Sequence, residues 1–368
     1  MKASQFDFPR FQDWLAGREE RMLRFLQGKS ESNVLLVERE FDNFLICRTP
    51  QESLEIQLDI LTRQMDLQSD YAPFLEPWFG VGVFANAFGA EYVWMEGESA
   101  QTHYIVFNEE QAARLEKPSI DDSPVMKLVL QAIDYFVEET RGVIPIACTD
   151  TQSPLDTITL LWDTASFFTA TYTAPEVVHS LLQKITDLII EFSRLQATHM
   201  GNAWAQPGHN SISARRAYGL SISDDNIVMV SPQHYAAFAV PYNEQIAAAF
   251  GGLAVHSCGD YIRQLPELLK TRRLSLVDAA FSLELDPNPI GDVERFRDLL
   301  KGTGVILYAR MGSDWPEILP RLLHPDLRLA ISVPVPGPGE AKDVNLRRLE
   351  AVLAQAGGSS TRLGQHDA

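Results

Sequence analysis

The feature that most constrains the fold is an alternation of short apolar runs with longer amphipathic runs along most of the chain. Eight runs have the character of strands, at 69–76, 143–149, 203–206, 220–223, 253–258, 277–285, 304–311 and 327–333. The segments between them place apolar residues three and four positions apart, which is typical of amphipathic helices. Alternating strands and helices favour βαβ units and a parallel sheet. Eight such units predict an α/β fold of the (β/α)8 TIM-barrel type.

Two of the helical segments can be predicted in more detail. Residues 175–196 begin with proline and keep the helical spacing throughout. Residues 231–250 begin with Ser-Pro, and we expect Pro241 to split or kink this helix because proline lacks a backbone donor. A doubly wound open sheet is the rival architecture, but no G-x-G-x-x-G motif follows any of the strand runs.

The chain contains no Ser/Gly-rich linker that would mark a division into separate domains. We expect a helical extension at 1–60 that packs on the barrel, a barrel domain at 61–356, and a flexible polar tail at 357–368.

Composition excludes several classes of function. The 368 residues carry a net charge of −18, which argues against nucleic acid or an anionic membrane surface as the main partner. No apolar run reaches the roughly 18 residues of a membrane span, and no signal peptide is visible. The three cysteines are far apart and do not form a disulfide framework. We expect a cytoplasmic protein with a small-molecule substrate. The sequence leaves open whether the protein forms a homo-oligomer.

One strand end has the chemistry of a metal site. The segment 251–260 reads GGLAVHSCGD, so that His256 and Cys258 stand two residues apart at the end of an apolar run. Residues at i and i+2 of a strand point to the same face. An imidazole beside a thiol suits zinc. A cysteine at such a place can also be a small core residue.

Other strand ends carry polar groups where a TIM barrel has its active site. Asp150 and Asp224 are our candidate catalytic residues, as oxygen ligands or proton acceptors. Each has a structural alternative, because Asp224 could cap the following helix and Asp150 could open a turn. Glu76 could be a loop residue or a ligand.

Four residues are candidates for substrate binding. Arg216, together with Arg215, and Arg310 could hold an anionic group, since arginine suits carboxylate and phosphate. Trp204 and Tyr242 could contact a flat hydrophobic ligand. The alternatives are a solvated arginine pair and ordinary aromatic packing.

The segment 222–260 resembles the uroporphyrinogen decarboxylase superfamily. It contains S-P-x-x-Y-x-x-F-x-x-P-Y, from Ser231 to Tyr242, followed by a strand that ends in H-x-C-G. The segments TDTQSPLDTITLLWD and TAPEVVHSLLQKITDLI are similar to the second-strand region of the same superfamily and the helix after it. The resemblance covers about 60–355, and H-x-C-G is most specific to the methyltransferase branch. It implies a (β/α)8 barrel that uses zinc to move a methyl group between a corrinoid protein and a thiol such as coenzyme M.

The resemblance assigns His256 and Cys258 as two zinc ligands. The family's third ligand is usually a cysteine after the last strand, but AISVPVPGPGEAKDVN contains none. Cys148 is the first candidate to replace it, and the oxygen alternatives are Asp224, Glu284 and Glu340. The decarboxylase branch holds porphyrin carboxylates with an arginine-rich loop, whereas CRTPQESLEIQL has one arginine, so uroporphyrinogen decarboxylation itself is not expected.

Three hypotheses therefore stand. The first is a zinc-dependent methyltransferase that moves a methyl group from a separate corrinoid-binding protein to a thiol. The second is a metal-independent decarboxylase or lyase whose carboxylate substrate is held by Arg215, Arg216 or Arg310. The third is a non-catalytic binding barrel. A fold alone does not decide among them.

Overall fold

A computed structural model describes residues 1–40 and 43–356, and its centre is a six-stranded parallel sheet in the order β1-β10-β9-β8-β7-β6. The strands are β1 (Val34–Glu38), β6 (Leu220–Ser223), β7 (Leu253–His256), β8 (Leu274–Ala280), β9 (Ile306–Arg310) and β10 (Leu329–Val333). Nearly all their residues are buried, as expected for parallel strands that helices cover.

Isolated β-bridges and single backbone hydrogen bonds close this sheet into a ring. The isolated parallel bridges are Leu75–Ile146, Ile146–Trp204 and Gln152–Ser223. The backbone amide of Asp70 donates to the carbonyl of Leu36 in β1. These contacts lead from β6 back to β1, and the chain has the predicted (β/α)8 TIM-type architecture.

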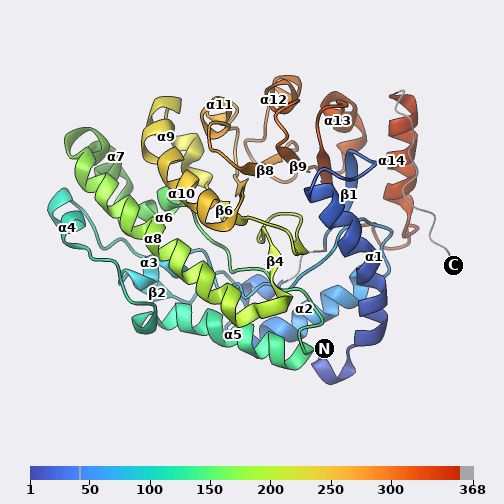
Figure 1. The fold of residues 1–368 in the computed structure, drawn as a ribbon, viewed down its shortest axis with the longest axis horizontal. Helices are drawn as coiled ribbons and strands as arrows, with labels where there is room; N and C mark the ends of the chain where they lie inside the picture. Colours follow the sequence, from blue (N-terminus) through green and yellow to red (C-terminus); the bar gives the residue numbers. More distant parts are fainter. Residues whose placement is uncertain (41–42, 357–368) are drawn as a thin grey trace.

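The helices lie outside the strands, with α9 to α13 along one side and α2, α5 and α8 along the other (Figure 1). They are α1 (Phe8–Leu26), α2 (Pro50–Gln64), α3 (Val83–Ala87), α4 (Glu109–Arg114), α5 (Pro124–Thr140), α6 (Pro154–Leu161), α7 (Thr164–Thr173), α8 (Pro175–Met200), α9 (Pro232–Phe238), α10 (Val240–Phe250), α11 (Leu265–Leu268), α12 (Val293–Leu300), α13 (Trp315–Leu322) and α14 (Val344–Gln355). In the described part of the chain, no helix combines the length and the apolar character that crossing a bilayer requires.

Helix boundaries follow the sequence signals closely. The helix predicted at 175–196 is α8, and the one predicted at 231–250 is split into α9 and α10 around Ala239. Pro241 occupies the first turn of α10, where its missing N–H does not interrupt the hydrogen-bond ladder. The Ser231 hydroxyl caps α9 by accepting from the backbone amide of His234.

Several strand predictions differ from the structure. The runs at 69–76 and 143–149 form no regular strands and join the ring only through isolated bridges at Leu75 and Ile146. The run at 203–206 is a hairpin strand, β4 (Ala205–Gln206), which pairs antiparallel with β5 (Ala214–Arg215). The sheet also contains β1, which falls inside the predicted 1–60 extension and pairs with β10. Its five residues VLLVE form a short, mostly apolar run that precedes the first of the eight predicted strands. The predicted tail, 357–368, lies outside the described residues, and the domain boundary at residue 60 stays a prediction.

Glu38 ends β1 as a fully buried carboxyl group with few compensating contacts. Its Oε1 atom accepts from Asn345 at 2.7 Å, and among the described residues its Oε2 atom has no hydrogen-bond partner. Burial raises the pKa of Glu38 to about 7, although the Asn345 hydrogen bond acts in the opposite direction. The protonated form therefore favours the folded state, and stability is lost as pH rises from the ordinary carboxyl pKa through about 7.

Replacing Glu38 by glutamine removes this penalty. We expect Glu38→Gln to raise the free energy of unfolding by roughly 2 kcal/mol at pH 8 and by less than ~1 kcal/mol at pH 5. Urea unfolding at both pH values measures the difference, and Glu350→Gln on the exposed face of α14 is the control. Equal gains at the two pH values would contradict an ionisation penalty at Glu38.

Candidate active site

A cavity of ≈ 220 Å³ opens at the carboxyl ends of the strands. Its wall consists of Arg39, Leu45, Glu76, Trp78, Val81, Asp150, Gln152, His209, Asn210, Ser223, Asp225 and His256. Several of these residues directly follow or end strands, because β1 precedes Arg39, β6 ends at Ser223 and β7 ends at His256. This is the end of a TIM barrel at which active sites form.

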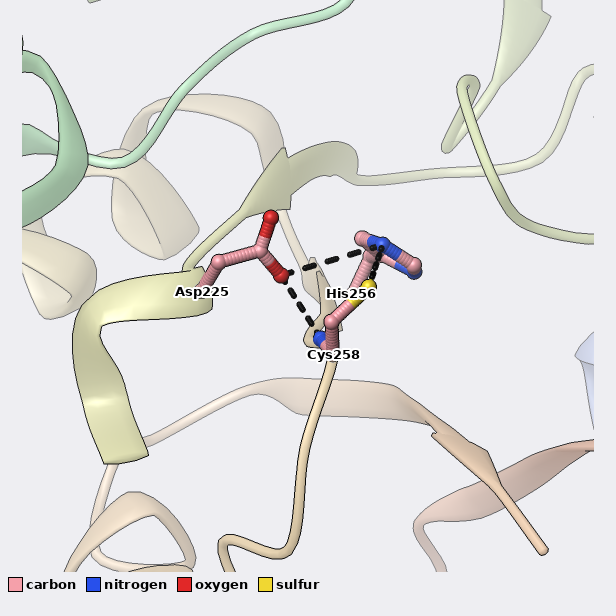
Figure 2. A group of neighbouring side chains, drawn as sticks. All are labelled: Asp225, His256 and Cys258. Atoms are coloured by element: carbon pink, nitrogen blue, oxygen red, sulfur yellow. Dashed lines mark hydrogen bonds and ion pairs between the residues drawn. The ribbon is translucent and has the colours of Figure 1, made fainter. Parts of the chain in front are cut away.

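Three potential metal ligands meet beside the cavity, and two of them, Asp225 and His256, are part of its wall. Asp225, His256 and Cys258 offer a carboxylate oxygen, an imidazole nitrogen and a sulfur that lie within 4.8 Å of one another (Figure 2). His256 Nε2 lies 3.7 Å from Cys258 Sγ and 3.9 Å from Asp225 Oδ1. Within the residues that the structure describes, this is the one group of three or more such side chains.

The imidazole of His256 is fixed from behind by a buried ion pair. Asp278 in β8 accepts from His256 Nδ1 at 2.7 Å and from Arg310 Nε at 2.6 Å. The Arg310 guanidinium also donates to the carbonyl of Ser257 at 3.0 Å. Asp278 thus occupies Nδ1 and leaves Nε2 directed toward Cys258 and Asp225. A carboxylate behind a histidine ligand is a common feature of metal sites.

These charges shift the pKa values of the anchored groups. Burial opposes the charge on His256, but Asp278 raises the pKa of the imidazole to about 10. Burial likewise opposes the charge on Asp278, but Arg310 and His256 lower the pKa of its carboxyl group. Before any metal binds, His256 is therefore an imidazolium, and a metal at Nε2 has to displace its proton.

The donor set fits zinc. Bond lengths of ~2.0 Å to nitrogen and ~2.3 Å to sulfur at a tetrahedral angle place these two atoms about 3.5 Å apart. The observed separation between His256 Nε2 and Cys258 Sγ is 3.7 Å. His256 is almost buried whereas Asp225 and Cys258 are more accessible, so one side of the group is open to a further ligand. Three protein ligands with an open position are typical of catalytic zinc sites.

Asp225 is held in place by the backbone around it. Its own amide donates to Asp156 Oδ2 at 2.7 Å, and the amide of Asn226 donates to Asp156 Oδ1 at 2.8 Å. Asp225 Oδ1 accepts from the amide of Cys258 at 2.6 Å. The loops after β6 and β7 are thereby tied together, which brings two of the three ligands to the same point.

A second polar network lines another part of the cavity. Glu76 accepts from Arg39 at 2.8 Å and from His209 Nδ1 at 2.9 Å. Burial opposes ionisation of Glu76, but His209 and Arg39 lower its carboxyl pKa to about 2. Burial also disfavours the charged form of His209, but Asp150 and Glu76 raise its imidazole pKa. Glu76 is therefore a carboxylate at neutral pH, and its negative charge favours the protonated form of His209.

Asp150 lies next to this network. It accepts from Ser223 Oγ at 2.9 Å, from Gln152 Nε2 at 3.0 Å and from Trp78 Nε1 at 3.4 Å. His209 Nε2 is 3.7 Å from its Oδ1 atom. The structure thus places this candidate catalytic residue in the cavity but outside the metal group.

The other candidate metal and catalytic residues lie elsewhere. Cys148 is fully buried against α8, with its sulfur 4.0 Å from the Ser193 carbonyl, and burial raises the pKa of its thiol to about 12. Asp224 accepts from Ser153 at 2.8 Å and from Tyr235 at 2.6 Å, and burial raises the pKa of its carboxyl group. Neither belongs to the described cavity wall, and the group formed with His256 and Cys258 contains Asp225 instead.

None of the four candidate substrate-binding residues is part of the described cavity wall. Arg216 lies before β6, at the opposite end of the strand from the cavity, where it pairs with Glu20. Tyr242 on α10 bonds to His179 on α8 at 2.8 Å, and Trp204 packs edge-on against Phe250. Arg310 donates to Asp278, which orients His256.

The two remaining oxygen alternatives are bonded in loops. Glu284 accepts from the backbone amide of Ser313 at 2.8 Å, and Glu340 accepts from the amide of Gly337 at 2.7 Å. Neither is in the metal group.

Comparisons with known proteins agree on the fold. The family model described as uroporphyrinogen decarboxylase (URO-D) matches residues 37–207. A solved structure of a methyltransferase from Methanosarcina mazei is similar with a TM-score of 0.63 and 15% sequence identity, and the match covers 92% of this chain and 98% of that one. A comparison with curated proteins finds no significant match.

Proposed function

We propose that this chain, which matches the uroporphyrinogen decarboxylase family model over residues 37–207, is a zinc-dependent methyltransferase of that superfamily. Its methyl donor would be a corrinoid carried by a separate protein, and its acceptor would be a thiol. The observation that carries the proposal is the convergence of His256, Cys258 and Asp225 at the cavity.

Each of these three residues has a defined task in the proposal. His256, oriented by Asp278, would give Nε2 to the metal, Cys258 would give a thiolate, and Asp225 would be the third protein ligand, a role for which the family resemblance implies a cysteine. When bound, zinc lowers the pKa of a thiol and so supplies a thiolate nucleophile at neutral pH. Exchanging a cysteine ligand for a carboxylate keeps the charge of the ligand set and replaces a soft donor by a harder one.

The remaining wall would orient the substrate. Leu45, Trp78 and Val81 give it an apolar part, which suits an alkyl chain. The exposed Cys258 marks the open side, through which the thiol proton can leave and a methyl donor can approach. The alternative of a carboxylate held by arginines has less support, because Arg215 and Arg310 are occupied by Glu19 and Asp278.

A methyl-transfer assay tests this function. Zinc-loaded protein, anaerobic methylcobalamin as the donor and 2-mercaptoethanol as the acceptor should give the methyl thioether, measured by mass spectrometry. The rate should exceed that of the His256→Ala protein, because the variant lacks the ligand that Asp278 anchors. If both proteins give the same rate, and thiol addition leaves the visible spectrum of the cobalt-substituted wild type unchanged, the proposal is wrong.

A further inference from the structure

His209 presents a hydrogen-bond donor to the cavity. Glu76 accepts from its Nδ1 atom at 2.9 Å and is held in turn by Arg39 at 2.8 Å, so the ring orientation is fixed. Its Nε2 atom makes no hydrogen bond among the described residues, and the 3.7 Å to Asp150 Oδ1 exceeds a hydrogen-bond length. The ring lies between the carboxylates of Glu76 and Asp150, which favour its protonated form, and in that form Nε2 offers an N–H group to a ligand.

Asp150 presents an acceptor beside this donor. Its three hydrogen bonds come from Ser223, Gln152 and Trp78, which are all uncharged. In the described part of the chain, the one cation recorded within 4 Å of it is His209. None of the three donors carries a positive charge, and the carboxylate has lone pairs left for a further donor.

We propose that His209 and Asp150 together bind the end of the substrate remote from its thiol, and that they select a head group that both accepts and donates a hydrogen bond. An amide or a hydroxyl meets this requirement, and a carboxylate or sulfonate does not. The inference rests on the proposed function in one respect, since it places the thiol at His256, Cys258 and Asp225.

The selection follows from the charges on the wall. A carboxylate head group that accepts from His209 comes close to the negative charge of Asp150, which repels it, whereas the charge of Glu76 is already paired with Arg39. An amide accepts the same hydrogen bond and donates its own N–H to Asp150. A site built to pair both partners rejects a ligand that leaves one of them unpaired.

A matched pair of thiols tests this selection. 3-Mercaptopropionamide and 3-mercaptopropionate have the same heavy-atom shape and differ in charge and in the donor. Titration calorimetry with zinc-loaded protein should show the amide binding about tenfold more tightly. Asp150→Asn should reduce the preference to less than about twofold, because asparagine donates to a carboxylate. His209→Gln should widen it, because the cation that attracts the carboxylate is lost.

The control is Asp187→Asn, an exposed substitution on α8 that should keep the wild-type preference. Tighter binding of the carboxylate, no binding of either thiol, or an Asp150→Asn protein that keeps the full preference would overturn the inference. If Asp150→Asn does not fold, His209→Gln alone tests whether His209 and Asp150 select the head group. An unchanged preference for the amide in that variant would then overturn the inference.

Propionamide and propionate, which lack the thiol, separate this inference from the proposed function. If the protein binds no zinc, or if zinc changes the affinity for neither thiol, the proposed function fails. The preference between propionamide and propionate, measured by ligand-observed NMR, then still decides whether His209 and Asp150 select the head group.

Discussion

Zinc binding is expected to be weakened by a factor of at least ~1,000 in the His256→Ala protein. The variant loses the ligand nitrogen and leaves Asp278 and Arg310 to pair with each other in the barrel wall. Cys258 and Asp225 then offer only two donors, whereas catalytic zinc sites usually have three protein ligands. Competition with a chromophoric chelator measures the affinity, and circular dichroism checks the fold.

Two further substitutions show which residue is the third ligand. Asp225→Asn should weaken zinc binding by about 10- to 100-fold, because an amide oxygen is a poorer zinc ligand than a carboxylate. Cys148→Ser is the control, since this thiol lies against α8 and not in the metal group. Unchanged affinity in the His256→Ala protein, or a loss in Cys148→Ser as large as in Asp225→Asn, would contradict the site.

The barrel could be predicted from the sequence because its signals are local. The apolar runs at β6, β7, β9 and β10 are bounded by turns, and serine and proline mark the helix starts. β1 was missed because it is a single short run that follows a long helix, α1, without the strand–helix alternation seen later in the chain. The segment around Ile146 was placed correctly, yet it takes part in the sheet through single bridges rather than a regular ladder.

Strand alternation explains why Asp225 and not Asp224 is in the site. Ser223 ends β6 on the cavity wall, and Asp225, two residues later, lies on the same side. Asp224 points the other way, toward Ser153 and Tyr235. The rule does not apply between Cys148 and Asp150, because the chain there is not a regular strand and does not keep the two-residue period.

The His209 network could not be predicted from sequence spacing. His209 follows a Pro-Gly pair in the turn between β4 and β5, and its partner Glu76 lies 133 positions earlier in the chain. No local pattern relates two residues that the barrel alone brings together. The position of Glu76 at the end of a predicted strand indicates a place in the site. Arg39 follows β1, where the sequence analysis predicts no strand, so its place in the site could not be predicted.

The Asp278→Ala protein should be destabilised by roughly 3–5 kcal/mol even without metal. Asp278 is fully buried and neutralises both His256 and Arg310, at 2.7 Å and 2.6 Å. Removing it leaves a guanidinium without its carboxylate partner in the barrel wall, whereas a surface ion pair contributes little. Asp298→Ala, which breaks exposed pairs with Arg297 and Lys301, is therefore the control and should change stability little.

The same substitution should act on the metal as well as on the fold. Without Asp278, the His256 ring loses the partner that fixes Nε2 toward Cys258, and zinc affinity should fall by about 10- to 100-fold. Asp278→Asn separates the two effects, because its amide oxygen can still accept from Nδ1 although the charge is gone. We expect it to retain more zinc affinity than Asp278→Ala while remaining less stable than the wild type in urea. If both variants unfold and bind zinc as the wild type does, Asp278 neither supports the barrel wall nor orients His256.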